Sequence, residues 1–146
     1  MVEFKRYPGI DAEGKPVLVT VASGPVIVRD GFVLLDKHGD DPFWKFPGGR
    51  TRDNESLQAT AMREAAEEVG LTDLVLHDKP VVLSFERGRD GMRELVTLYH
   101  YWATTKQEPK KQRDVRELAW HKIDALPADC APNIKPVMAA FQRMGK

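Results

Sequence analysis

The stretch from Glu55 to Val69 has the spacing of an amphipathic helix, in a chain whose other apolar runs are mostly typical of strands. Its apolar residues recur every four positions and form one narrow stripe: Leu57, Ala61, Ala65 and Val69. Asp53 or Asn54 is expected to cap the start of this helix, and Gly70 is expected to end it. The fold must therefore bury one long helix against a sheet.

Short apolar runs bounded by turn residues predict strands on both sides of this helix, over 17–21, 25–29, 32–35, 75–85, 94–104 and 115–121. Asp30-Gly31 predicts a hairpin turn between the second and third of these runs. A second amphipathic helix is expected over 134–144. The order strands, helix, strands, helix favours an α/β sandwich with helices on the two sides of a sheet.

Bulk composition narrows the class of protein. A length of 146 residues fits one domain over 1–146. Lys+Arg and Asp+Glu both number 22, so the formal charge is zero and general electrostatic binding of nucleic acid is not expected. The one cysteine, Cys130, cannot form a disulfide within the chain. Residues 1–10 lack the apolar core of a signal peptide, and there is no run of 18 apolar residues, so we expect a cytoplasmic protein with no membrane segment.

Three glutamates lie within five residues on the predicted helix. Glu64 and Glu67 are three residues apart, and Glu64 and Glu68 are four apart, so all three fall within about half of the helix circumference. Like charges at this spacing destabilise an isolated helix by about 0.2–0.5 kcal/mol per pair. A bound cation would offset that repulsion, and ligands that are all oxygen select Mg²⁺, with Mn²⁺ as a substitute.

Neighbouring residues support a site at this cluster rather than a solvated acidic face. Pro47-Gly48-Gly49 precedes the helix, and glycine permits a backbone path that turns a carbonyl toward the same cation. Arg63 lies next to Glu64 and can hold a carboxylate in place by a charged hydrogen bond. Glu55 opens the helix and could pair with Arg63.

At this point the sequence resembles the Nudix hydrolase family. The segment GRTRDNESLQATAMREAAEEVGL, from Gly49 to Leu71, has the glycines, glutamates and arginine of the Nudix signature at the family's spacing. With each residue near 7% in average usage, seven fixed matches arise by chance roughly once in 10⁸ start points. Ala65 departs from the pattern, since a larger aliphatic residue is usual there.

The resemblance implies a Nudix-type α/β/α sandwich with a mixed β-sheet over 1–146. It also implies a pyrophosphohydrolase, a hydrolase acting on phosphorus-containing anhydrides, with Mg²⁺ as cofactor. By resemblance the metal ligands are Gly48, Glu64, Glu67 and Glu68. The catalytic residues are Glu64, Glu68 and Arg63, with Glu64 as either a ligand or the general base, and Glu55 and Gly49 support the cluster.

Several further residues are candidates for the site, and their positions in the sequence do not distinguish among them. A carboxylate late in the chain often completes the site in this family, and Asp114, Glu117 and Glu108 are the candidates. Arg50 and Arg87 are candidates for contact with substrate phosphate. A solvated surface charge is the competing interpretation for each of these residues.

The signature predicts the reaction and leaves the substrate open. The short chain favours a nucleoside triphosphate or a dinucleoside polyphosphate, and an RNA 5′ end and a homodimer are not excluded. The main alternative is a nucleotide-binding sensor with the same fold and no turnover, which the three glutamates argue against. An isomerase on this fold would need a cysteine near the site, and Cys130 lies far along the chain.

Overall fold

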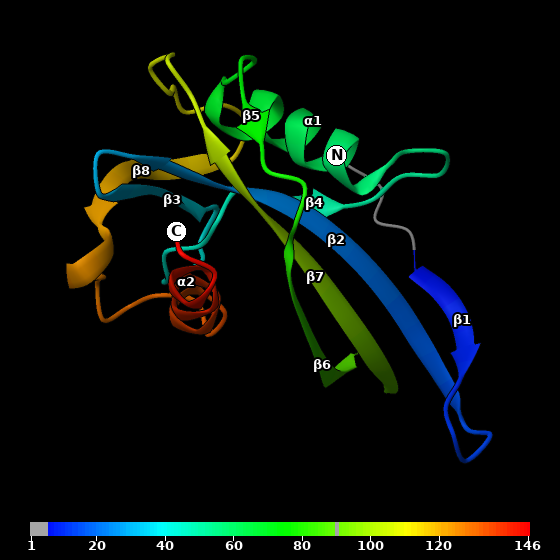
Figure 1. The fold of residues 1–146 in the computed structure, drawn as a ribbon. Coiled ribbons are helices and arrows are strands. Elements are labelled where there is room, and N and C mark those ends of the chain that lie inside the picture. The colour runs from blue at the N-terminus through cyan, green and yellow to red at the C-terminus, as the bar shows by residue number, and fades with distance from the viewer. Residues whose placement is uncertain (1–5, 90) are drawn as a thin grey trace.

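The computed structural model describes residues 6–89 and 91–146. The first five residues, which belong to the stretch that argues against a signal peptide, lie outside the described residues. Asp90 lies outside them as well. A long twisted sheet runs through the molecule, with one helix against each of its faces (Figure 1).

Within residues 6–89 and 91–146 the sheet has eight strands. They are β1 (Arg6–Ile10), β2 (Pro16–Arg29), β3 (Phe32–His38), β4 (Gly49–Arg50), β5 (Val75–Leu76), β6 (Val81–Arg89), β7 (Met92–Thr104) and β8 (Val115–Lys122). The helices are α1 (Leu57–Val69) and α2 (Ile134–Arg143), and a 3₁₀ turn, η1 (Ile123–Ala125), follows β8. No helix in the described part of the chain is both long and apolar enough to cross a membrane.

The main strand order is β5-β7-β2-β3-β8. β2 and β7 run parallel over eleven residue pairs, whereas the other paired strands are antiparallel, so the predicted mixed sheet is confirmed. β6 pairs with β7, and β1 and β4 pair with β2. β2 is therefore the strand on which the other parts of the sheet are assembled.

Alternation along β2 divides the core between the two helices. Ile27 packs in the cluster that contains Ala65 and Val69 of α1, whereas Val26 and Val28 pack with α2. Successive side chains of a strand point to opposite faces, so α1 and α2 cover opposite sides of the sheet. The predicted α/β/α sandwich is thus confirmed.

The strand boundaries differ from the prediction in two places. The runs 17–21 and 25–29 form one continuous strand, β2, because residues 22–24 between them remain extended. The run 75–85 is divided into β5 and β6, which pair with different ends of β7. The Asp30-Gly31 hairpin is confirmed, with φ of 51° and 83° at its two residues.

The first helix ends as expected and begins later than expected. Gly70 adopts the left-handed conformation, with φ of 68°, and its N–H donates to the Ala65 carbonyl. The N-cap is Ser56, whose side chain accepts a hydrogen bond from the Ala59 N–H, so the expected cap at Asp53 or Asn54 is wrong. Asn54 instead takes a left-handed turn conformation, with φ of 60°.

Candidate functional site

The segment before α1 is tied to β2 at both ends. Gly49 of β4 pairs with Ser23 of β2, and the Ser23 hydroxyl donates to the Leu57 carbonyl at 2.7 Å, in the first turn of α1. A Cβ added at Gly24 would lie 2.2 Å from the Pro47 carbonyl oxygen. The Pro47–Gly49 entry therefore packs directly against the backbone of β2, which fixes where α1 begins.

Glu64 and Glu68 lie on the buried face of α1 and point toward this entry. Their exposed fractions are only 2% and 5%. The Gly48 N–H donates to Glu68 Oε2 at 3.4 Å. A Cβ at Gly49 would lie 2.5 Å from Glu64 Oε1, so only glycine leaves room for that carboxylate. The two glycines and the two carboxyl groups thus form one close-packed cluster.

Arg63 connects the glutamates to each other and to β4. Its guanidinium donates to both oxygens of Glu55, at 2.7 and 3.0 Å. It also donates to Glu64 Oε1 at 2.7 Å and to Glu67 Oε2 at 3.1 Å. A further bond reaches the Arg50 carbonyl at 3.1 Å. The expected Glu55–Arg63 pair is present, and this arginine holds three carboxylates at fixed positions.

Of these carboxylates, Glu55 accepts the most hydrogen bonds from the described residues. Besides Arg63, it accepts hydrogen bonds from the Thr60 hydroxyl at 2.7 Å and the Arg52 N–H at 3.2 Å. The bonds from Arg63 are the main cause that lowers the pKa of Glu55 from 4.5 to about 2. Glu55 is therefore ionised at any pH at which the protein would work.

Replacing Glu55 by glutamine is expected to destabilise the protein at neutral pH. The variant loses a charged hydrogen-bond pair to Arg63, which contributes about 1.5–3 kcal/mol. Because the folded-state pKa is depressed, this contribution is present above pH 4.5 and is lost as pH falls toward about 2. Urea unfolding of both proteins over this pH range measures it, and a constant difference would contradict the assignment.

Glu67 lies on a more exposed side of α1 than the other two glutamates of the cluster. Its side chain is 20% exposed and is surrounded by cationic groups. Arg113 lies 3.0 Å from Oε2, and Arg52 lies 3.7 Å from Oε1, in addition to Arg63. The structure therefore brings Glu64 and Glu68 together in the interior and places Glu67 at the rim, where an approaching phosphate would meet arginines as well.

The Glu68 carboxyl is strongly perturbed. Burial is the main cause that raises its pKa from 4.5 to about 9, and the neighbouring carboxyls of Glu64 and Asp36 add to the shift, while Lys45 opposes it. A buried carboxyl group whose ionised form is disfavoured is suited to a divalent cation, which would replace its proton on binding. The donor set of Glu64, Glu68 and the Gly48 backbone thus fits a hard cation.

A largely apolar cleft of about 700 Å³ lies beside this cluster. Gly48 and Gly49 line it, so the cleft opens onto the entry segment that contacts the glutamates. The rest of the lining comes from β2, β6, β7 and the start of α2, and includes Thr20, Leu83, Phe85, Tyr99 and Asn133. A ligand in this cleft could place an apolar ring against the sheet and a charged group at the glutamates.

Both arginines that are candidates for substrate phosphate line this cleft. Arg87 on β6 donates from Nε to Glu94 at 2.6 Å, and the Thr20 hydroxyl donates to the same carboxylate at 2.7 Å. Glu94 is fully buried, so it fixes Arg87 at the cleft wall. Arg50 is 8% exposed, and its carbonyl is the one that accepts from Arg63. Their contact with substrate stays a prediction.

The candidate late carboxylates are Asp114, Glu117 and Glu108. Glu117 forms ion pairs with Lys37 at 3.6 Å and with Arg116 at 3.8 Å. Asp114 is an exposed residue before β8, and Glu108 pairs with Arg29 at 3.0 Å. Their role in completing the site stays a prediction.

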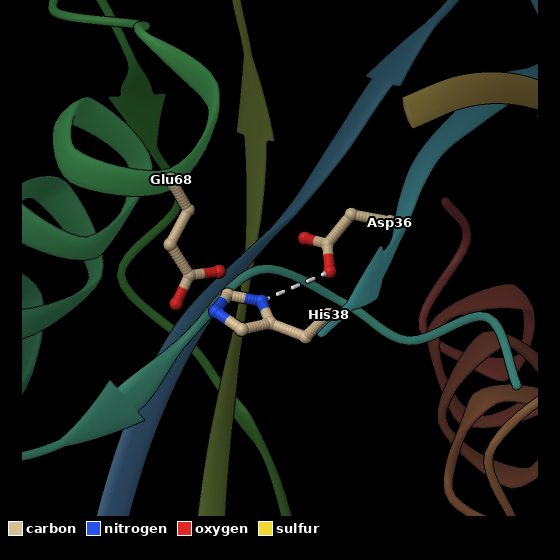
Figure 2. A group of neighbouring side chains, drawn as sticks. All are labelled: Asp36, His38 and Glu68. Carbon is tan, nitrogen blue, oxygen red and sulfur yellow. Dashed lines mark ion pairs between the residues drawn. The ribbon is translucent and has the colours of Figure 1, made fainter. Parts of the chain in front are cut away.

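Two residues that the sequence analysis did not single out lie next to Glu68. Asp36 and His38, near the end of β3, each place a ligand-type atom within 4.8 Å of the others and of Glu68 (Figure 2). The signal in the sequence was an acidic residue, Asp36, directly after the apolar run Phe32–Leu35, at a position that alternation assigns to the same face as Leu34.

Comparison with known proteins supports the expected family. The sequence model of the NUDIX domain family matches residues 18–141, from β2 through α2. A crystal structure of a MutT NUDIX hydrolase from Burkholderia pseudomallei has a TM-score of 0.63 and 25% sequence identity. That comparison covers 83% of this chain and 96% of the other. The fold and the family model therefore agree.

Two curated relatives differ in the share of their own length that aligns with this chain. An 8-oxo-dGTP diphosphatase from Proteus vulgaris is 43% identical over 75 residues, covering 36% of this chain and 67% of the relative. The m7GpppN-mRNA hydrolase dcap-2 from Caenorhabditis elegans is 25% identical over 130 residues. That alignment covers 88% of this chain and spans only 16% of the relative's length.

Proposed function

Because the chain belongs to the NUDIX domain family, we propose that it is a divalent-metal-dependent pyrophosphohydrolase that cleaves the diphosphate bond of a nucleoside diphosphate derivative. The observation that carries the proposal is the placement of Glu64 and Glu68 in the interior, held by Arg63 against Gly48 and Gly49. This cluster adjoins a cleft large enough for a nucleotide.

Glu64, Glu67, Glu68 and the Gly48 carbonyl would hold the cation, which we expect to be Mg²⁺ with Mn²⁺ as a substitute. When bound, the cation supplies neutralisation of diphosphate oxygens and a lower pKa for an attacking water. Glu64 would serve either as a ligand or as the general base. Arg63 keeps the carboxylates oriented, and Glu55 keeps Arg63 in place.

We propose a nucleoside triphosphate or a dinucleoside polyphosphate as the substrate. The cleft offers apolar surface and the Phe85 and Tyr99 rings to a base, with Arg87 at the wall and the glutamates beyond Gly48. The relative named 8-oxo-dGTP diphosphatase supports an oxidised nucleoside triphosphate as one member of this class. The relative named m7GpppN-mRNA hydrolase favours a capped RNA 5′ end as the second candidate.

Turnover of a nucleotide panel tests the proposal. The panel holds canonical and oxidised nucleoside triphosphates, dinucleoside polyphosphates, ADP-ribose, sugar nucleotides and capped RNA, each with Mg²⁺ and with EDTA. We expect phosphate or pyrophosphate release that requires Mg²⁺, with a nucleoside triphosphate or dinucleoside polyphosphate turned over fastest. Added phosphatase reveals monophosphate products.

Two results would contradict the proposal in different ways. Fastest turnover of capped RNA would overturn the substrate class and keep the reaction. Tight metal-dependent binding of one panel member with no product would favour a nucleotide sensor over an enzyme.

Replacing Phe85 by alanine is expected to raise KM about tenfold for the best substrate and leave kcat within about twofold, because stacking of a base on an aromatic ring contributes about 1–3 kcal/mol. Phe85 lines the cleft from β6 and is 38% exposed, so its ring is accessible to a base. Steady-state kinetics with the substrate found in the panel measures both constants.

Val82→Ala is the matched control for this variant. Val82 lies on the same strand and is 49% exposed, and alternation places it on the face opposite to Leu83 and Phe85. Its KM should equal that of the unmodified protein. An equal KM change in both variants would show that the base does not bind against Phe85.

A further inference from the structure

Asp36 is a buried carboxylate in an apolar setting. Alternation along β3 places it on the α1 face with Leu34, and its partner across β8 is Leu118, which packs in the same apolar cluster. The side chain is 0% exposed, and neither carboxylate oxygen has a hydrogen-bond partner among the described residues. The nearest cationic group, Lys45 Nζ, lies 4.0 Å away, beyond hydrogen-bond distance.

His38 and Glu68 complete a cluster around this carboxylate. His38 Nδ1 lies 3.6 Å from Asp36 Oδ1, and it too is buried without a hydrogen-bond partner in the described part of the chain. Figure 2 shows the Glu68 side chain reaching from α1 toward the imidazole, and the Asp36 side chain reaching it from β3. One ligand-type atom of each residue lies within 4.8 Å of the other two.

We propose that Asp36, His38 and Glu68 form a second divalent-cation site, distinct from the one expected at Gly48, Glu64 and Glu67 and sharing Glu68 with it. A buried carboxylate is costly unless it is paired or coordinates a metal. Two carboxylates and a neutral imidazole carry a charge of −2, which a divalent cation neutralises. That cation also accepts lone pairs from the Asp36 and His38 atoms that lack other partners.

The ligand chemistry selects a transition ion over Mg²⁺. The imidazole nitrogen suits Zn²⁺ and the two carboxylates suit Mn²⁺, whereas Mg²⁺ favours oxygen ligands and bound water. Ligands about 2.1 Å from a tetrahedral ion lie about 3.4 Å apart, so the cluster needs a small contraction on binding. Asp36 and His38 lie two residues apart on one strand, and rotation of their side chains can supply it.

Counting bound Mn²⁺ tests the site without any use of turnover. Metal-free protein is titrated with Mn²⁺, and free ion is followed by electron paramagnetic resonance. The unmodified protein should bind two Mn²⁺ ions. Asp36→Asn and His38→Gln should each bind one ion, and any second ion should bind at least tenfold more weakly than in the unmodified protein. Glu67→Gln, a change at the other site only, should keep the ion that depends on Asp36.

The second cation site rests on the proposed function only because Glu68 belongs to both sites. The second site and the hydrolase function can therefore fail separately. Mn²⁺ counts and affinities that are equal in the unmodified protein, Asp36→Asn and His38→Gln would overturn the second site, whatever the nucleotide panel shows. Two bound ions in a protein that hydrolyses no panel member would contradict the enzyme and keep the site.

Circular dichroism and thermal unfolding of the metal-free proteins check the fold. Asp36→Asn removes, at nearly constant shape, a buried carboxyl group that has no hydrogen-bond partner among the described residues, so its metal-free Tm should not be lower than that of the unmodified protein. Saturating Mn²⁺ should raise the Tm of the unmodified protein more than that of either variant. Broadening of the His38 ring signals by Mn²⁺ in proton NMR is expected as well, and its absence would exclude His38 as a ligand.

Discussion

Glu68→Gln is expected to lower kcat by about two to four orders of magnitude, the range over which a single positioned acid or base contributes. Glu68 is buried beside Glu64 and accepts a hydrogen bond from Gly48, so no other described side chain can take its position. Glutamine keeps the shape and removes the negative charge that a cation needs. Steady-state turnover of the best panel substrate with Mg²⁺ measures the loss, and near-normal turnover would contradict the site.

The metal-free fold should survive this change. Burial raises the pKa of Glu68 to about 9, so the group carries a proton at neutral pH and glutamine has the same charge. A folded-state pKa raised above 4.5 gives stability that is lost as pH rises toward about 9. Urea unfolding at about pH 5 and about pH 8 should therefore show a smaller loss in Glu68→Gln. Glu13→Gln, at an exposed turn, is the control for activity.

Gly24→Ala should reduce kcat/KM about 100-fold, although this residue carries no functional group. A Cβ there would lie 2.2 Å from the Pro47 carbonyl oxygen and 2.8 Å from the Gly48 Cα. Both contacts are backbone atoms, so the entry segment must move as a whole, and a shift of about 1 Å at a reacting group can cost about 100-fold. We also expect about 1–3 kcal/mol of destabilisation from overpacking.

Gly88→Ala provides the matched control for that substitution. Gly88 also lies in a strand, β6, and nothing lies within 4 Å of a Cβ added there. Its kcat/KM and urea midpoint should match those of the unmodified protein. Equal losses in the two variants would attribute the effect to lost backbone freedom at glycine rather than to displacement of the Pro47–Gly49 entry.

The spacing of apolar residues predicted the long helices and strands. It did not predict the short strands, which form only by pairing with another strand. α1, α2, β3, β7 and β8 follow from apolar spacing because each buries a face of its own. β1 and β4 were not predicted, because short strands such as the two-residue β4 are ordered by pairing with β2. Pro25 begins the second of two separate predicted runs, 17–21 and 25–29, whereas it lies inside the single strand β2. It pairs with Tyr101 in the continuous ladder between β2 and β7, so the two runs join into one strand.

The same contrast applies to the candidate site. Glu64, Glu67, Glu68 and Arg63 were predictable because one helix fixes their relative positions through sequence spacing alone. Asp36 and His38 were not, since they approach Glu68 from β3, some thirty residues earlier, and only the packing of α1 on the sheet brings them together. Spacing along a chain predicts neighbours within an element, and neighbours between elements require the fold.

The parallel pairing of β2 with β7 has a consequence for synthesis of the chain. Every pair in that ladder, from Leu18–Glu94 to Val28–Thr104, joins residues 76 positions apart. The glutamates of α1 thus leave the ribosome well before the strand that completes the sheet, and until Thr104 emerges one long edge of β2 has no partner. Such non-local pairing slows folding and exposes the nascent chain to aggregation. Chains arrested before β7 should therefore need chaperone protection, whereas those arrested after it should not.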